Sequence, residues 1–363
     1  MGIDQAAIHM LLSPQFWRMA VFWSLALIYS YLRLHFAVLF SGGRRTLPPR
    51  RRFSPDPAAE VQRPICIITG ATSGLGKAAA LAMASEGYHV VLAGRCAKSL
   101  SKTIQEIMQE NEGAHLNSFQ VDMSSIDSIV KFERSFKRWL LDSNLHPSVQ
   151  LLLNNAGILA TSSRNTDDGY DQMMQTNYMS AFVLTNLLLP LLKKSPVPSR
   201  IVNVTSFTHH CVTSLKLDYK LFCHAPTSAK YPFAQVYEYS KLCLLLFSYE
   251  LHRRLHAETP SSNISIIAVD PGVVQTRIMR EIPVSLSRLA FAVLKFLHLL
   301  QSPEVGVSSI VDAALAPPKT SGEYFFGGMG GKIKSSSLSY NPELAAELWL
   351  KSSMLFQKQM NEL

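Results

Sequence analysis

The stretch ICIITGATSGLGK at residues 65–77 decides the fold. Its first five residues are apolar or β-branched, which is typical of a strand covered on both faces. Glycines follow at positions 70, 74 and 76, and residues 75–87 have helical spacing. Glycines allow a tight turn and let the backbone approach a pyrophosphate, which then lies at the positive N-terminus of the helix. This strand–turn–helix context predicts a dinucleotide-binding loop.

The same alternation of short apolar runs and longer helical ones continues toward the C-terminus. We expect strands at residues 65–69, 89–93, 116–121, 149–155, 200–206, 264–269 and 322–326, and helices at 75–87, 97–112, 125–143, 172–194 and 237–256. Such alternation implies a parallel sheet with helices on both faces. We therefore predict an α/β fold, a Rossmann-type, doubly wound, seven-stranded parallel sheet that forms a single catalytic domain over residues 64–363.

The positive charge of the chain is concentrated at its N-terminus. The 363 residues have a formal net charge of +9, and 47% of them are hydrophobic, enough for a large core. Residues 1–63 hold eight arginines against three acidic residues, and the rest has no basic stripe with interleaved aromatics. This distribution argues against a nucleic-acid partner. The five cysteines are scattered without a CxxC pair, so neither disulfides nor zinc is indicated and a reducing compartment fits best.

We interpret residues 1–40 as a hydrophobic anchor. Residues 19–32 carry no charge, but fourteen helical residues extend only ~21 Å, less than the ~30 Å hydrocarbon core. The run reaches sufficient length at residue 40 if Arg33 and His35 extend to the interface or face a partner. A cleaved targeting peptide is the alternative.

Residues 41–63 are expected to form a basic, proline-rich linker. Its five arginines between positions 44 and 52 place the catalytic domain on the cytosolic side of the membrane. We expect residues 1–63 to hold the protein at this membrane without contributing to the active site. The endoplasmic reticulum is the expected location, and an organelle envelope is the alternative.

The second predicted strand indicates which dinucleotide binds. It ends at Gly94, and Arg95 follows. An NAD-binding unit would offer an acidic residue to the ribose hydroxyls here. A planar guanidinium instead suits the 2′-phosphate of NADP. We therefore predict NADP(H) as the cofactor.

Tyr237 is the one tyrosine of twelve that has a lysine four residues later, Lys241. At this spacing on a helix, two side chains share one face. A nearby ammonium favours phenolate, so we expect Lys241 to lower the tyrosine pKa from about 10. The pair then suits proton exchange with a substrate hydroxyl or carbonyl. A surface Tyr–Lys pair is the alternative, but the dinucleotide loop favours the catalytic interpretation.

With these residues, the chain resembles the short-chain dehydrogenase/reductase family over about residues 64–350. The motif TGxxxGxG lies at residues 69–76, NNAG at 154–157, YxxxK at 237–241 and a Pro-Gly motif at 270–276. Within the family, the chain is most similar to the retinol-dehydrogenase-like and protochlorophyllide-reductase-like branch. TSFTHH at residues 205–210 and the long insert before Tyr237 indicate this branch.

The resemblance implies a catalytic set of Asn177, Ser206, Tyr237 and Lys241. Ser206 would hold the substrate oxygen beside Tyr237, and Thr205 is a minor rival for this role. Asn177 would support a proton-relay water near Lys241, or it is only the amide of a helix kink.

The resemblance also implies the cofactor contacts. Asp122 would contact adenine, Asn155 the cofactor ribose side, and Thr276 the carboxamide. The residues expected at the cofactor are Gly70, Thr72, Ser73, Gly74, Leu75, Gly76, Arg95, Asp122, Asn155, Ala156, Gly157, Tyr237, Lys241, Pro271, Gly272, Val274 and Thr276. His209 and His210 have no acidic partner nearby in the sequence, so we predict no metal site.

The apolar run at residues 282–300 is expected to cover the substrate, either as a core helix or as a lid that touches the bilayer. Together with the anchor, it indicates a lipophilic alcohol, aldehyde or ketone of retinoid, polyprenoid or steroid type. We predict an NADP(H)-dependent oxidoreductase of CH–OH groups. The alternative is an NADP(H)-binding sensor in a membrane assembly. Membrane lipid is the expected partner, and a homodimer stays open.

Overall fold

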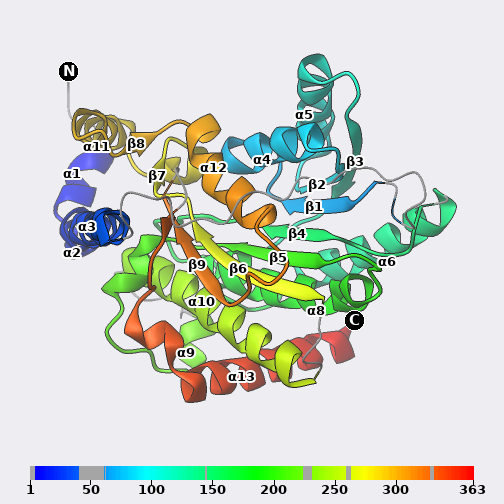
Figure 1. Ribbon diagram of the computed structural model, residues 1–363. Coiled ribbons are helices and arrows are strands. Elements are labelled where there is room, and N and C mark those ends of the chain that lie inside the picture. Colours follow the sequence, from blue (N-terminus) through cyan, green and yellow to red (C-terminus); the bar gives the residue numbers. More distant parts are fainter. Residues whose placement is uncertain are drawn as a thin grey trace.

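The computed structural model describes residues 5–40, 61, 63–143, 145–223, 231–258, 263–327 and 331–363. Within these ranges, eight strands form one sheet in the order β10-β9-β6-β5-β4-β1-β2-β3. Helices cover both faces of this sheet (Figure 1). The α/β, doubly wound architecture is therefore confirmed.

The seven predicted strands are present, are parallel, and differ from the predicted ranges by at most two residues at either end. They are β1 (Ile65–Thr69), β2 (His89–Gly94), β3 (His115–Gln120), β4 (Leu151–Asn154), β5 (Ser199–Val204), β6 (Ile264–Asp270) and β9 (Glu323–Phe326).

The predicted number of seven strands is wrong by one. Strand β10 (Gly331–Lys332) pairs antiparallel with β9, with Gly331 opposite Phe326. A two-residue strand of glycine and lysine has neither the length nor the β-branched composition that marks a strand in a sequence. A separate two-stranded sheet pairs β7 (Val273–Val274) with β8 (Leu300–Gln301).

The core has one layer on each face of the sheet. Alternate residues of β1 point to opposite faces, so Ile65 and Ile67 join one apolar cluster and Cys66 and Ile68 join the other. The second cluster lies under α4 (Gly74–Ser85), α5 (Ala97–Glu110) and α12 (Pro303–Ala314).

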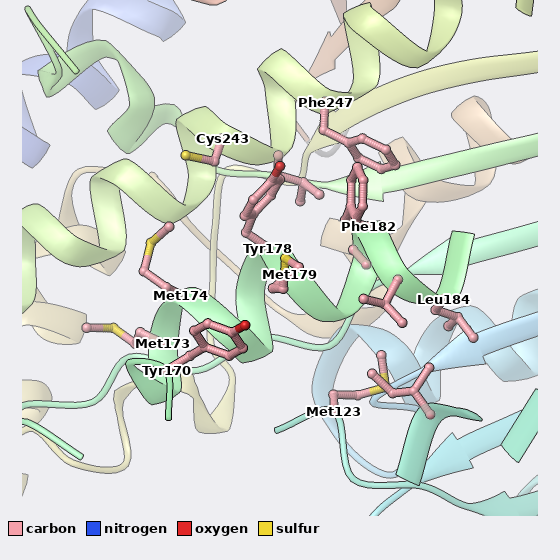
Figure 2. Close-up of a cluster of buried hydrophobic side chains, with 14 of the residues drawn as sticks. Met123, Tyr170, Met173, Met174, Tyr178, Met179, Phe182, Leu184, Cys243 and Phe247 are labelled. Atoms are coloured by element: carbon pink, nitrogen blue, oxygen red, sulfur yellow. The ribbon is translucent and has the colours of Figure 1, made fainter. Parts of the chain in front are cut away.

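The first cluster lies under α6 (Ile126–Asp142), α8 (Ser180–Lys193) and α10 (Phe233–Glu258), with α13 (Pro342–Glu362) outside α10. Figure 2 shows part of it, where Phe182 of α8 meets Phe247 of α10 with ring centroids 5.3 Å apart. Tyr178 and several methionines fill the adjoining space (Figure 2). The shorter helices on this side are α7 (Gln172–Met174) and α9 (Tyr219–Phe222).

The N-terminal segment is helical and lies on the surface of the catalytic domain. It comprises α1 (Gln5–Leu11), α2 (Pro14–Arg18), a π-helical turn (Met19–Trp23) and α3 (Ser24–Phe40). The run Pro14–Phe40 is long and apolar enough to cross a membrane by length and composition. One side of α3 packs against the 3-10 helix Phe207–Cys211 and strand β10. Figure 1 shows this segment in dark blue, beside α11 (Val284–Phe296).

Candidate active site

Most of the predicted site residues follow the carboxyl ends of six parallel strands. Because parallel strands end at the same edge of a sheet, the segments after β1, β2, β3, β4, β5 and β6 meet there. This edge therefore carries the glycine loop, Arg95, the NNAG segment, Ser206 and the Pro-Gly segment.

The loop after β1 requires glycine at three positions. Gly70 and Gly74 have φ angles of +66° and +53°, in the left-handed region that glycine adopts without strain. A Cβ atom on Gly76 would lie 2.2 Å from the carbonyl oxygen of Gly70. Ser73 precedes α4 without a capping hydrogen bond from its side chain, which leaves the helix N-terminus open to an anion. The glycine loop and the open N-terminus of α4 together fit a pyrophosphate.

The NNAG segment is tied to this loop through Thr69. The Thr69 hydroxyl accepts hydrogen bonds of 3.0 Å from the backbone N–H groups of Asn155 and Ala156. The Asn155 side chain donates to the Thr69 carbonyl oxygen at 2.8 Å. Two of the predicted cofactor residues therefore hold the loop in place.

The Pro-Gly segment folds over the loop from the other side. A Cβ atom on Gly74 would lie 3.0 Å from the Thr276 methyl group, so Thr276 closes over the start of α4. Gly272 has a φ of +75°, which makes the turn that carries the chain there. Val274 contacts α12, because a Cβ on Gly306 would lie 2.4 Å from it. Pro271 lies in the same turn, and its carbonyl oxygen accepts from Gln301.

The remaining cofactor candidates lie near the ends of β2 and β3 and at the start of α4. Thr72 approaches the end of β2, where a Cβ on Gly94 would lie 3.2 Å from its methyl group. Arg95 follows and is exposed. Asp122 accepts hydrogen bonds from the Ser124 N–H and hydroxyl groups at 2.9 and 2.7 Å, which fixes its carboxylate after β3. Leu75 contacts α12 near Gly306.

Tyr237 and Lys241 lie one turn apart on α10, and the Lys241 Nζ atom is 5.7 Å from the centre of the Tyr237 ring. Ser206 caps the short helix after β5, and its hydroxyl lies beside the Tyr237 phenol, where it opposes the rise of the phenol pKa. Thr205 instead donates to the Lys241 carbonyl oxygen at 3.0 Å. Its hydroxyl is therefore committed to the backbone, while that of Ser206 faces the phenol.

Asn177 completes this group. A Cβ on Gly157 would lie 3.5 Å from both the Asn177 Oδ1 atom and the Lys241 Nζ atom. The Asn177 amide donates to the Ile158 carbonyl oxygen and the Ser240 hydroxyl, and accepts from the Ile158 N–H group. Asn177 also lies in a π-helical turn, Gln175–Met179, a distortion that is frequent at functional sites. The structure brings all four candidate catalytic residues together.

Burial controls the proton affinities at this site. It lowers the pKa of Lys241 to about 8, against the opposing field of the Asp270 carboxylate. It also raises the pKa of Asp270 to about 7 and raises the pKa of Tyr237 above its usual value. The expectation that Lys241 lowers the Tyr237 pKa is therefore wrong for the protein chain by itself. A phenol that keeps its proton suits the role of proton donor.

Two N-terminal residues reach this site, which sequence reasoning missed. The Trp23 ring packs on the Tyr237 ring with centroids 5.3 Å apart. Arg18 forms an ion pair with Glu238, the neighbour of Tyr237. These contacts place part of residues 1–63 against the candidate active site, while the expectation that this segment does not contribute to it stays a prediction. The available signal in the sequence was that Arg18 and Glu238 are ionisable residues with an apolar or aromatic residue on each side.

The apolar run at residues 282–300 forms helix α11, in which no residue is buried. Val284, Leu289, Val293 and Phe296 are exposed, Phe296 to 81%. The interpretation of this run as a core helix is therefore wrong. Helix α11 lies beside the segment that contains α3 (Figure 1), and its Leu294 packs against the same apolar cluster as Ala26 and Leu27.

Comparison with known proteins agrees with this geometry. Residues 64–215 match the family described as short chain dehydrogenase. Polyprenol dehydrogenase of Homo sapiens is 34% identical over 295 residues, which cover 79% of this chain and 83% of that protein. Retinol dehydrogenase 13 of Homo sapiens is 32% identical over 293 residues, with coverages of 80% and 83%.

Among solved structures, an NADPH-bound carbonyl reductase from chicken fatty liver has the same fold, with a TM-score of 0.54 and 20% identity. The match covers 75% of this chain and 98% of that one.

Proposed function

Because the chain belongs to the short-chain dehydrogenase/reductase family and has a polyprenol dehydrogenase and a retinol dehydrogenase among its relatives, we propose that it interconverts a lipophilic alcohol and its aldehyde or ketone with NADP(H). The observation that carries this proposal is the convergence of Asn177, Ser206, Tyr237 and Lys241 beside the glycine loop. A protein that only senses the dinucleotide has no physical need for this set.

The candidate residues divide the work of carbonyl reduction. Bound NADPH supplies the hydride to the carbonyl carbon. The Ser206 hydroxyl holds the carbonyl oxygen next to the Tyr237 phenol, beside which it lies. Tyr237 gives its proton to this oxygen as negative charge develops there. Lys241 places a cation behind the phenol, and Asn177 connects it to a path for the replacement proton.

Arg95 is proposed as the residue that selects NADP(H). It is exposed directly after β2, at the edge where the ribose of a bound dinucleotide lies in such sheets. The carbonyl reductase with the same fold holds NADPH. Asp122 and Thr276 are proposed at the adenine and carboxamide ends of the cofactor.

The proposed substrate class rests on two apolar surfaces and on the relatives. Leu25, Ile28, Leu32 and Phe36 are exposed on α3, and helix α11 exposes its own apolar residues nearby. We propose that both surfaces contact lipid on the cytosolic side of a membrane, from which the substrate enters. A polyprenol and retinol dehydrogenase are relatives, which supports a long-chain isoprenoid substrate.

Turnover by the full-length, detergent-solubilised protein tests this function. NADPH oxidation would be followed with retinal, a polyprenal, a steroid ketone and a small water-soluble aldehyde, and repeated with NADH. We expect turnover with NADPH, most efficient for one of the isoprenoid aldehydes. Tight NADPH binding without turnover of any carbonyl or alcohol would contradict the proposal.

A further inference from the structure

The helical run Pro14–Phe40, here called the N-terminal helix, presents a regular stripe of residues to the catalytic domain. Met19, Ala26, Leu27 and Ser30 are buried, and Trp23, Tyr31 and Leu34 pack against the same apolar cluster as Ala26 and Leu27. These positions recur every three or four residues, which is the spacing of one helix face. The contact therefore extends along the helix and is not confined to one end.

The N-terminal helix supplies the hydrogen-bond partners of the buried Glu238 carboxylate. The Glu238 side chain is 0% exposed. Arg18 donates to both of its oxygens from Nε, at 3.0 and 3.1 Å, and Trp23 donates from its indole N–H at 2.9 Å. In the described part of the chain, the carboxylate thus depends on the N-terminal helix for its charge partner. A buried charge without such a partner is strongly destabilising.

The same helix also contacts both halves of the reaction site. The Trp23 ring lies on the Tyr237 ring, which is almost fully buried. About two turns of helix further on, the Tyr31 hydroxyl accepts a hydrogen bond from Gln301 at 3.1 Å. A Cβ on Gly272 of the Pro-Gly segment would lie 3.0 Å from that hydroxyl. The helix therefore bridges the candidate proton donor and a candidate cofactor-binding turn.

We propose that Arg18 and Trp23 are positioning residues for Tyr237, so that the N-terminal helix is part of the active site and not only an anchor. This inference rests on the proposed function of Tyr237 as proton donor. Arg18 neutralises Glu238, and the two together fix the first turns of α10 on which Tyr237 stands. Trp23 covers the Tyr237 ring and keeps water from the phenol.

Variants of the full-length protein test this role. Arg18→Gln, Glu238→Gln and the double variant would be compared with Arg33→Gln, which removes an arginine of the same helix that hydrogen-bonds only Tyr29 of its own helix among the described residues. Trp23→Leu would be compared with Trp17→Leu, since Trp17 is exposed and, within the part of the chain that the structure describes, hydrogen-bonds only the Leu11 carbonyl oxygen. The measurements are the NADPH Kd, kcat and KM for a water-soluble carbonyl, and amide hydrogen exchange of residues 233–241.

Arg18→Gln should lower kcat by about tenfold or more and accelerate exchange in residues 233–241, because it leaves the Glu238 charge unpaired. The NADPH Kd should stay within about threefold, because the glycine loop is untouched. The double variant should recover kcat by about fivefold or more over Arg18→Gln, because the unpaired charge is gone. Trp23→Leu should lower kcat to a similar extent, and the two control variants should match the wild type.

A kcat unchanged in Arg18→Gln and Trp23→Leu would overturn the proposal, even if both variants melted at lower temperature, since a purely structural helix gives that pattern. Equal kcat in Arg18→Gln and the double variant would overturn the role assigned to the ion pair. If the wild type turned over no carbonyl, the proposed function would fail. Hydrogen exchange would still report whether the helix fixes α10, because it requires no turnover.

Discussion

The Nζ atom of Lys241 donates a hydrogen bond of 3.0 Å to the carbonyl oxygen of Val204, the last residue of strand β5. Thr205 makes a second link by donating to the Lys241 carbonyl oxygen, also at 3.0 Å. These bonds attach α10 to the strand that carries Ser206. The spacing between Ser206 and Tyr237 is therefore set by the sheet and not by a loop.

Tyr237→Phe should lower kcat at least about 100-fold, the usual contribution of a general acid. The NADPH Kd should stay within a few-fold, because the ring that packs against Trp23 remains. Tyr239→Phe is the matched control: it removes a hydroxyl two residues away that accepts from Gln235. Steady-state turnover and NADPH fluorescence titration measure both effects. Comparable activity in the two variants would exclude Tyr237 as the proton donor.

Ser206→Ala should lower kcat by about 100-fold, because the substrate oxygen loses the hydroxyl that holds it beside the phenol. Thr205→Ser should retain most of the activity, since serine keeps the donor for the Lys241 carbonyl oxygen. The assay is carbonyl reduction at saturating NADPH. If Thr205→Ser were inactive and Ser206→Ala active, Thr205 and not Ser206 would be the residue that holds the substrate oxygen.

NADPH affinity should fall as the pH rises through about 8, because burial lowers the pKa of Lys241 to about 8. Above that pH the amine is neutral and no longer attracts the anionic cofactor. The Asp270 carboxylate raises this pKa, so Asp270→Asn should lower the pH at which the NADPH affinity falls. Fluorescence titrations between about pH 6 and 10 would record the NADPH Kd at each pH. The same pH dependence in Lys241→Met would assign the fall in affinity to another group.

Arg95→Asp should weaken NADPH binding by about tenfold or more and shift the preference toward NADH, because a phosphate partner becomes an acceptor for ribose hydroxyls. Lys358→Asp makes the same change in charge on the exposed part of the C-terminal helix and should leave the preference unchanged. The ratio of the Kd values for NADPH and NADH measures the effect. An unaltered ratio in Arg95→Asp would mean that another residue reads the 2′-phosphate.

Most of the sheet could be predicted from the sequence because strands such as β1 are covered on both faces. Ile65 and Ile67 belong to one core layer and Cys66 and Ile68 to the other, so β1 is apolar throughout. Strand β10 has no such pattern. It exists because β9 lies beside it, which is information from tertiary structure.

The candidate site also has one part that could be predicted from the sequence and another that could not. The glycine loop and the Tyr237–Lys241 pair are local patterns, and the structure places them as their spacing indicates. The raised pKa of Tyr237 depends on burial by segments distant in sequence, so spacing alone gave the wrong direction. The Arg18–Glu238 pair joins positions 220 residues apart, and no local pattern links them.

That separation also has a consequence for how the protein is made. Arg18 leaves the ribosome among the first residues, whereas Glu238 follows 220 positions later. Contacts between such distant positions form late, because bringing the two segments together costs loop entropy that nearby contacts do not. Until Glu238 has been synthesised, Arg18 therefore lacks the acidic partner that it has in the folded protein, and the N-terminal helix cannot yet occupy its final place against α10.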